Sequence, residues 1–301
     1  MQTQATRERR DRTSEQLSLS GQQARERLIA AMPVIERRTE LAGIPTAVLE
    51  GGEGPPVVLL HGPGEYAAKW FGVIPELAAS HRVIAPDLPG HGASGGGPLD
   101  VERVLTWLAE LIEGTCPVPP TLVGQIVGGA IAARFAARHG ERIERLVLSD
   151  SLGLAPFRPT PEFWEALSGF LADPTEDSHD RLWDRCTFDL DGLRTRLGDR
   201  WWALRAYNLD RANAPEVRAA MESLMAEFGM PQIPEAELAR IAVPTTLIWG
   251  RHDLATSLAV AEAASERYGW TLHVVEEAAD DPPIEKPAAF LAALQGVLES
   301  P

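Results

Sequence analysis

The stretch TLVGQIVGGAIAARFA, residues 121–136, carries the pattern on which the fold prediction depends. Its first part is short, apolar and rich in β-branched residues, which is typical of a buried strand, and its last part is an alanine-rich segment that favours a helix. Between them, Gly124 and Gly128 bracket a connection short enough to require a sharp turn. A strand that passes through such a turn into a helix is a building unit of layered α/β proteins.

Apolar runs of strand length alternate with longer segments of helical period on both sides of this unit. The alternation predicts an α/β fold with a mostly parallel sheet covered by helices on both faces. Asp100 is a good N-cap for a helix that ends near Gly114. Residues 37–41 and 46–50 are expected to pair as an antiparallel edge. The other predicted strands are residues 57–60, 82–85, 121–123, 145–148, 245–249 and 271–275.

The alternation stops between residues 154 and 238, where the pattern is helical only and predicts an inserted helical cap. The core is then divided into two parts, residues 26–153 and 239–301, after a flexible tail over residues 1–25. Aromatic residues are dense in the cap, where they either join the cap to the core or line a pocket for a sizeable apolar ligand. They include Trp164, Trp183, Trp201, Trp202 and Tyr207.

Two further segments, HGPGEYAAKW at 61–70 and RVIAPDLPGHGAS at 82–94, stand at a characteristic spacing before the first stretch. Together the three resemble the α/β-hydrolase superfamily with a helical cap, over about residues 39–298. The resemblance implies that the loop His61-Gly62-Pro63-Gly64 contributes a backbone N–H to an oxyanion hole. Such donors, from the stretch Pro63-Gly64-Glu65 or from Val127, do not depend on a serine and could polarise a substrate carbonyl.

In the same resemblance, residues 124–128 stand at the nucleophile elbow, whose family pattern is G-x-S-x-G. The nucleophile position is then occupied by Ile126, which has neither a lone pair nor an ionisable proton and cannot attack a carbonyl. A β-branched residue also tolerates the strained elbow backbone poorly. Two interpretations follow: the turn has relaxed and Ile126 forms the wall of an apolar pocket, or the residue drifted after activity was lost.

The resemblance also implies positions for the acid and the histidine of a catalytic triad. Asp253, in IWGRHD at 248–253, takes the acid position. The family's last loop reads roughly G-H-x-P-x-x-E-x-P, and ADDPPIEKP at 279–287 places Asp280 where the histidine would be. His252 is the main candidate to refill that role, and His179 in the cap is a weaker one. The motif-loop histidines His61 and His91 are interpreted as structural.

If Asp253 and Asp280 occupy these positions, two carboxyl groups face each other across a cavity and one should have a raised pKa. They would supply an acid and a base for isomerisation, epimerisation, cyclisation or elimination, and Asp281 is a further candidate. Alternatively, Asp280 and Asp281 only cap the turn before Pro282. Two other functions stay open: a non-catalytic protein that binds a small molecule or a partner, and a hydrolase in which an aspartate activates water.

Composition narrows the classes of partner. The formal net charge of −15 disfavours nucleic acids and anionic membranes, and the one basic run, residues 7–12, lies in the predicted tail. Absence of a signal peptide or a long apolar segment predicts a cytoplasmic protein. Cys116 and Cys186 are expected to be free thiols, and no motif indicates a metal or a cofactor. The expected partner is an apolar small molecule, and the sequence indicates no oligomeric state.

Overall fold

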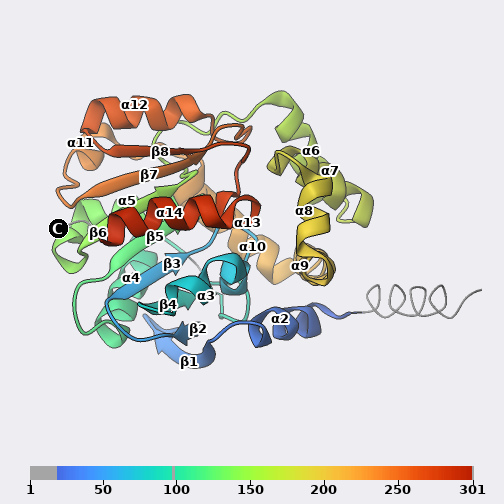
Figure 1. The fold of residues 1–301 in the computed structure, drawn as a ribbon, viewed down its shortest axis with the longest axis horizontal. Helices are drawn as coiled ribbons and strands as arrows, with labels where there is room; N and C mark the ends of the chain where they lie inside the picture. The colour runs from blue at the N-terminus through green and yellow to red at the C-terminus, as the bar shows by residue number, and fades with distance from the viewer. Residues whose placement is uncertain (1–18, 97–98, 300–301) are drawn as a thin grey trace, which may run out of the picture.

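The structure is a computed structural model that describes residues 19–96 and 99–299. Its core is an eight-stranded sheet in the order β1-β2-β4-β3-β5-β6-β7-β8 (Figure 1). Strand β2 pairs antiparallel with β1 and β4, and the remaining pairs are parallel. The predicted α/β-hydrolase fold is confirmed, and the predicted strand ends differ by at most two residues from those observed. The strands are β1 Ile35–Leu41, β2 Ile44–Gly51, β3 Pro56–Leu60, β4 Arg82–Pro86, β5 Thr121–Gln125, β6 Arg145–Ser149, β7 Thr245–Gly250 and β8 Thr271–Val275.

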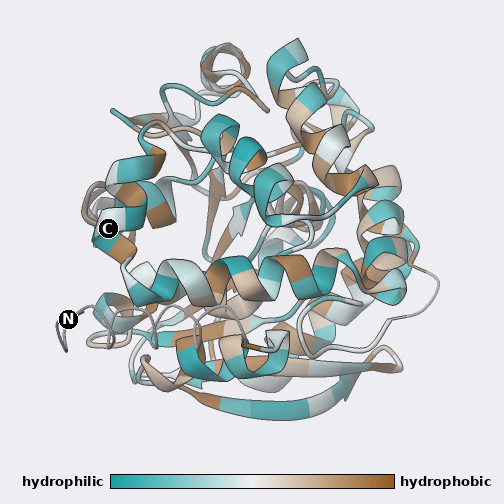
Figure 2. Cartoon of the chain, turned by 90° about the vertical axis from the view of Figure 1, so that its right-hand side faces the viewer, coloured by the Kyte–Doolittle hydropathy of each residue, from teal (hydrophilic) through white to brown (hydrophobic). Residues whose placement is uncertain are grey.

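Both faces of the sheet are buried, because successive side chains of a strand point to opposite sides. In β3, Val58 and Leu60 belong to one hydrophobic cluster, and Val57 and Leu59 belong to a second. The first cluster includes α4 (Val101–Thr115), α5 (Val127–His139) and α12 (Leu258–Tyr268), and the second includes η1 (Ala67–Gly72), α3 (Ile74–Leu77) and α14 (Pro287–Leu298). Helices in Figure 2 carry alternating hydrophilic and hydrophobic bands, as expected of helices with one buried face.

Only helices lie between β6 and β7, and Figure 1 shows α6 to α9 gathered at one end of the sheet. Parallel strands end at a common edge, so the cap faces the loops that follow the strands. Trp183 of α7 and Trp201 of α9 meet edge to face, with ring centroids 5.1 Å apart. The cap elements are α6 Pro161–Ala172, α7 Glu176–Cys186, α8 Leu190–Leu197, α9 Asp199–Ala212, α10 Pro215–Leu224, η3 Met225–Gly229 and α11 Glu235–Leu238.

Helix α2 (Gly21–Ala30) begins inside the stretch predicted to be a flexible tail, so that boundary was placed too late. Ser20 and Gln23 form a capping box that starts the helix, and Ala24 and Leu28 are buried in the same cluster as residues of α9. The favourable cap and the apolar face explain the order of this segment. Residues 1–18 of the predicted tail, with the basic run at 7–12, lie outside the described residues.

Arg25 joins α2 to the core through a buried ion pair, in which Nη2 lies 2.7 Å from Oδ2 of Asp87. We expect Arg25→Ala to lower the free energy of unfolding by about 3 kcal/mol, because it leaves the fully buried Asp87 carboxylate without its counter-charge. Chemical denaturation measures the change. The control is Arg27→Ala, an exposed position on the same helix, for which a loss below about 0.5 kcal/mol is expected. Equal stability of the two variants would contradict the assignment.

Candidate active site

The turn between β5 and α5 keeps the strained backbone of a nucleophile elbow. Ile126 has φ 50° and ψ −112°, a conformation that β-branched residues rarely adopt. The turn is held by close approach of the backbone: a methyl group on Gly124 would lie 2.3 Å from the carbonyl oxygen of Gly128. The interpretation that the turn had relaxed is therefore wrong. The other half of that interpretation agrees with the structure, because Ile126 lines the pocket.

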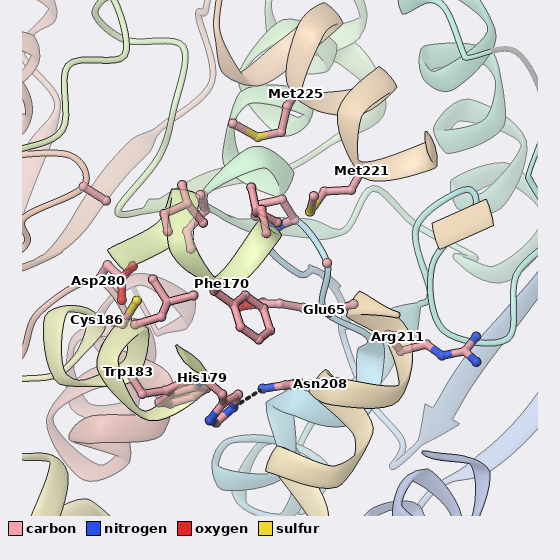
Figure 3. Close-up of a pocket in the computed structure, with 18 of the residues that line it drawn as sticks. Glu65, Phe170, His179, Trp183, Cys186, Asn208, Arg211, Met221, Met225 and Asp280 are labelled. Atoms are coloured by element: carbon pink, nitrogen blue, oxygen red, sulfur yellow. Dashed lines mark hydrogen bonds between the residues drawn. The ribbon is translucent and has the colours of Figure 1, made fainter. Parts of the chain in front are cut away.

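A cavity of about 180 Å³ lies between the elbow and the cap. Its walls are mainly apolar and aromatic, and the ionisable side chains of its lining include Glu65, Lys69, Asp280 and Asp281. Figure 3 shows Glu65 and Asp280 among the lining residues. This composition suits an apolar small molecule with one polar end. The apolar lining includes Ile126, Leu152, Phe157, Phe163, Leu167, Phe170, Leu171, Leu182, Trp183, Val217, Met221 and Met225.

Asp280 lines this cavity, whereas Asp253 is not among the lining residues. Both are buried in the loops that follow β7 and β8. Asp253 Oδ1 accepts hydrogen bonds from the backbone N–H groups of Ala255 (2.7 Å) and Thr256 (2.8 Å). Its Oδ2 is buried without a hydrogen-bond partner among the described residues. The expectation that the two carboxyl groups face each other across a cavity is therefore corrected. Asp280 lines the cavity, whereas Asp253 is buried outside its lining.

A third buried carboxyl, Asp150, joins this pair and was missed in the sequence analysis. It follows β6 with φ 45°, and it accepts hydrogen bonds from the N–H of Gly250 (2.9 Å) and the hydroxyl of Ser149 (2.9 Å). Its position in the sequence, directly after β6, could have indicated it. The carboxyl end of β6 lies beside the carboxyl end of β5, where the elbow begins. A carboxylate at that edge of a parallel sheet is a site candidate on topology alone.

Burial and mutual repulsion perturb the acid cluster. Burial raises the pKa of Asp253 to about 7. Burial, reinforced by the charge of Asp253, raises the pKa of Asp280 and of Asp150 well above their ordinary values. Burial also raises the pKa of Glu285, the last residue of the short helix α13 (Pro282–Glu285) that follows the Asp280 loop, to about 7. Asp280 therefore presents to the cavity a carboxyl group that holds its proton more tightly than a carboxyl group in water does.

Next to these acids, Lys69 holds two carboxylates at the elbow. Its Nζ forms ion pairs with Glu65 and with Asp281 Oδ2, the latter at 2.9 Å. Asp281 Oδ1 accepts a hydrogen bond of 2.9 Å from the side-chain amide of Gln125, the residue before the elbow. The alternative that Asp281 only caps the turn before Pro282 is therefore wrong, because its side chain makes no capping hydrogen bond and is bound to Gln125 and Lys69. Sequence reasoning did not single out Lys69 or Gln125, since the partner that they share, Asp281, lies more than 150 residues away from each.

The backbone donors predicted for the oxyanion loop are partly occupied. The N–H of Gly62 donates to Oε2 of Glu65 at 2.8 Å, and Pro63 has no N–H to offer. Pro63 and Gly64 line the cavity, whereas Gly62 and Val127 are not among its lining residues. The loop therefore contributes fewer free donors than the motif implied.

None of the histidines considered in the sequence analysis lies beside Ile126 as a triad base would. His61 is fully buried, with Nδ1 2.7 Å from the carbonyl oxygen of Gly62, and Nε2 accepts the N–H of Leu88. Burial lowers its pKa well below the ordinary value, which favours the neutral, structural role expected for it. His252 is exposed, with its ring 4.6 Å from that of Phe188, and it does not line the cavity.

His179 does line the cavity, but its ring is engaged within the cap. Nε2 lies 3.3 Å from Nδ2 of Asn208, and Nδ1 lies 3.3 Å from Asp180 (Figure 3). At the C-terminal end of the same helix, α7, the half-buried Cys186 lies beside Asp280 (Figure 3). Burial and the Asp280 charge raise the pKa of this thiol well above its ordinary value, so it is a weak nucleophile at neutral pH.

Over residues 19–96 and 99–299, no three His, Cys, Asp or Glu side chains are grouped in a way that could hold a metal ion. Within the same ranges, no helix has the length and apolar character needed to cross a bilayer.

Comparisons with known proteins agree with this fold. Residues 55–287 match the family model described as alpha/beta hydrolase fold. The chain is 35% identical to 2-hydroxymuconate semialdehyde hydrolase of Pseudomonas sp. strain CF600, over 88% of this chain and 93% of that protein. It is 31% identical to pimeloyl-[acyl-carrier protein] methyl ester esterase of Aeromonas hydrophila, over 81% and 95%. The crystal structure of 2-hydroxy-6-oxo-6-phenylhexa-2,4-dienoate hydrolase from Rhodococcus sp. strain RHA1 matches with a TM-score of 0.78 and 25% identity, covering 89% of this chain and 99% of that one.

Proposed function

Because this chain belongs to the alpha/beta hydrolase family, we propose that it is an enzyme that works without the family's serine triad. Its substrate is an apolar, carbonyl-bearing small molecule, and its chemistry is acid/base catalysis by carboxyl groups. Asp280 acts on the substrate, and Asp253 acts through Asp280. The reaction class is isomerisation, epimerisation, cyclisation or elimination.

One observation carries this proposal: at the position that the family resemblance gives to the triad histidine, a buried carboxyl group with a raised pKa lines a mainly apolar cavity. Burying carboxyl groups together costs folding free energy, and such groups cluster at functional sites. A protein that only bound an apolar ligand would need no acid cluster behind its pocket. Ile126 is a second, independent support, because the elbow places a hydrocarbon side chain in the cavity where a covalent mechanism needs a nucleophile.

Two proton transfers convert the bound ketone or aldehyde into its enol. Protonated Asp280 donates its proton to the carbonyl oxygen of the bound substrate. The carboxylate of Asp281, which lines the same cavity, takes a proton from the carbon next to that carbonyl, and the product is the neutral enol. Asp281 then gives its proton to another carbon or to a departing leaving group, while Asp280 takes back the proton of the enol hydroxyl, so that both carboxyl groups regain their starting states. Asp253 is a positioning residue here, because its charge helps to raise the pKa of Asp280.

Proton exchange tests this proposal without knowledge of the substrate. Apolar methyl ketones, including 4-phenylbutan-2-one, are incubated with the protein in D₂O and followed by NMR. We expect protein-dependent exchange of the protons next to the carbonyl, with no addition of water. Binding of these ketones without any exchange would overturn the proposal in favour of a binding protein.

The names of the relatives favour a second candidate, hydrolysis of an ester or another carbonyl compound by water that an ionised Asp280 activates as a base. Matching esters and β-diketones in H₂¹⁸O separate the two candidates. Incorporation of ¹⁸O into a carboxylate product, lost in Asp280→Asn, would establish this second function. Exchange without ¹⁸O incorporation would establish the first.

A serine alone should not restore the family's covalent mechanism. In Ile126→Ser, no imidazole lies beside the new hydroxyl to accept its proton, so we expect no labelling by a fluorophosphonate probe. The double variant with Asp280→His supplies an imidazole in front of Asp253 and should be labelled. Intact-protein mass spectrometry measures both variants. Labelling of the single variant at the rate of the double would show that another base serves position 126.

A further inference from the structure

The side chain of Glu65 fills the space beside the elbow where the loop after β3 offers its backbone to a ligand. Its Oε2 accepts the N–H of Gly62 at 2.8 Å, and its Oε1 pairs with Lys69. A methyl group on Gly62 would lie 2.9 Å from Oε2 of Glu65 and 3.1 Å from Cδ1 of Ile126. The Glu65 carboxylate and the tip of the Ile126 side chain therefore both lie close to Gly62, and both side chains line the cavity.

The charges at this end of the cavity do not cancel. Glu65 and Asp281 share the single ammonium group of Lys69, which leaves one negative charge over the three side chains. The side chain of Lys69 is only 7% exposed and that of Glu65 only 16%, so bulk water screens this charge weakly. The rest of the cavity lining is mainly apolar. Its two arginines, Arg211 and Arg218, come from the cap helices α9 and α10 and not from the elbow, and Arg211 is paired with Asp210.

We infer that Glu65 is a specificity-determining residue that takes the place of a bound anion and makes the cavity select uncharged carbonyl compounds over carboxylates. An anionic group at the elbow would have to displace Glu65 from Gly62 or lie against it, and like charges in contact cost several kcal/mol. A ketone or aldehyde carries no charge and can take its hydrogen bond from Asp280. The inference rests on the proposed function only in that the cavity binds a carbonyl compound.

A matched pair of ligands tests this selection. 4-Phenylbutan-2-one and 3-phenylpropanoate have the same skeleton, with a methyl group in the ketone where the carboxylate has its second oxygen. Isothermal titration calorimetry at pH 7.5 measures the affinity of the full-length protein for each. We expect the wild type to bind the ketone at least about tenfold more tightly than the carboxylate.

The variant Glu65→Gln keeps the size of the side chain and removes its charge, while the Lys69–Asp281 pair remains balanced. We expect it to bind 3-phenylpropanoate at least about tenfold more tightly than the wild type does, and the ketone within about threefold. Glu76→Gln removes the same charge at an exposed position on α3, outside the cavity lining, and should leave both affinities unchanged.

The outcomes separate this inference from the proposed function. Equal affinity of the wild type for the two ligands would overturn the role of Glu65, and it would do so even if Glu65→Gln failed to fold. A gain for the carboxylate in Glu65→Gln no larger than in Glu76→Gln would also overturn it. If the wild type bound neither ligand, the carbonyl-binding cavity of the proposed function would be overturned, and the inference with it.

Discussion

Asp280→Asn should abolish proton exchange, with a loss of about a hundredfold or more. The amide fills the same space but cannot transfer a proton to the substrate oxygen, while the apolar walls of the cavity are unchanged. Affinity for 4-phenylbutan-2-one should therefore stay within a few fold of the wild type. NMR exchange rates and calorimetric affinities, measured on the same preparations, separate the loss of chemistry from a loss of binding.

The pH dependence of the wild type provides a second check. Asp280 must be protonated to act as the acid, so activity should be highest below its raised pKa and fall as the pH rises through it. Asp184→Asn, at an exposed position on α7, is the matched control and should keep full activity. An Asp280→Asn protein that exchanged protons as fast as this control would rule out Asp280 as the acid.

Asp253→Asn should make the protein more stable at pH 8. The folded-state pKa of Asp253 is about 7, compared with about 3.9 for an unfolded aspartate. A raised pKa gives stability that is complete below the unfolded value and is lost as the pH rises from about 4 through about 7. Above that range, the ionised carboxylate costs on the order of a few kcal/mol, and an amide avoids this cost. A rise in melting temperature of roughly 5 °C is therefore expected at pH 8.

The substitution should keep the existing local bonds, because an asparagine oxygen can accept the N–H groups of Ala255 and Thr256 as Oδ1 does now. Scanning calorimetry at pH 5 and pH 8 measures the effect, and the gain should shrink at pH 5. Asp100→Asn is the control: it changes the exposed cap of α4 to another good N-cap and should shift neither value. A fall in stability at pH 8 would show that the Asp253 charge supports the fold.

The fold could be predicted closely because its signals are local. Each strand is a short apolar run between turn residues, and the pair Gly124 and Gly128 marked the elbow although its central residue is atypical. Helix α2 was missed at its start for the opposite reason, since it depends on contacts of Ala24 and Leu28 with distant residues. The capping-box residues Ser20 and Gln23 alone were too weak a sequence signal to place the start of this helix.

The site could be predicted only in part. Alignment of motif loops found Asp253, Asp280 and Ile126, but not which of the two acids reaches the cavity. Glu65 lay within the quoted motif, yet only its backbone had been considered. The role of its side chain follows from its hydrogen bond with Gly62 and its ion pair with Lys69. Both contacts depend on how the loop after β3 folds back. Such tertiary contacts have no periodic signature in a sequence.

The tight backbone around the elbow has a practical consequence for work on this protein. The backbone is packed so closely around Gly124 and Gly128 that a side chain at either position would clash with it. This packing fixes the turn and with it the direction in which residue 126 projects. Any side chain introduced there should enter the cavity along the same line, whatever its chemistry. Position 126 is thus a natural attachment point for a fluorescent or nitrile reporter that senses what occupies the interior.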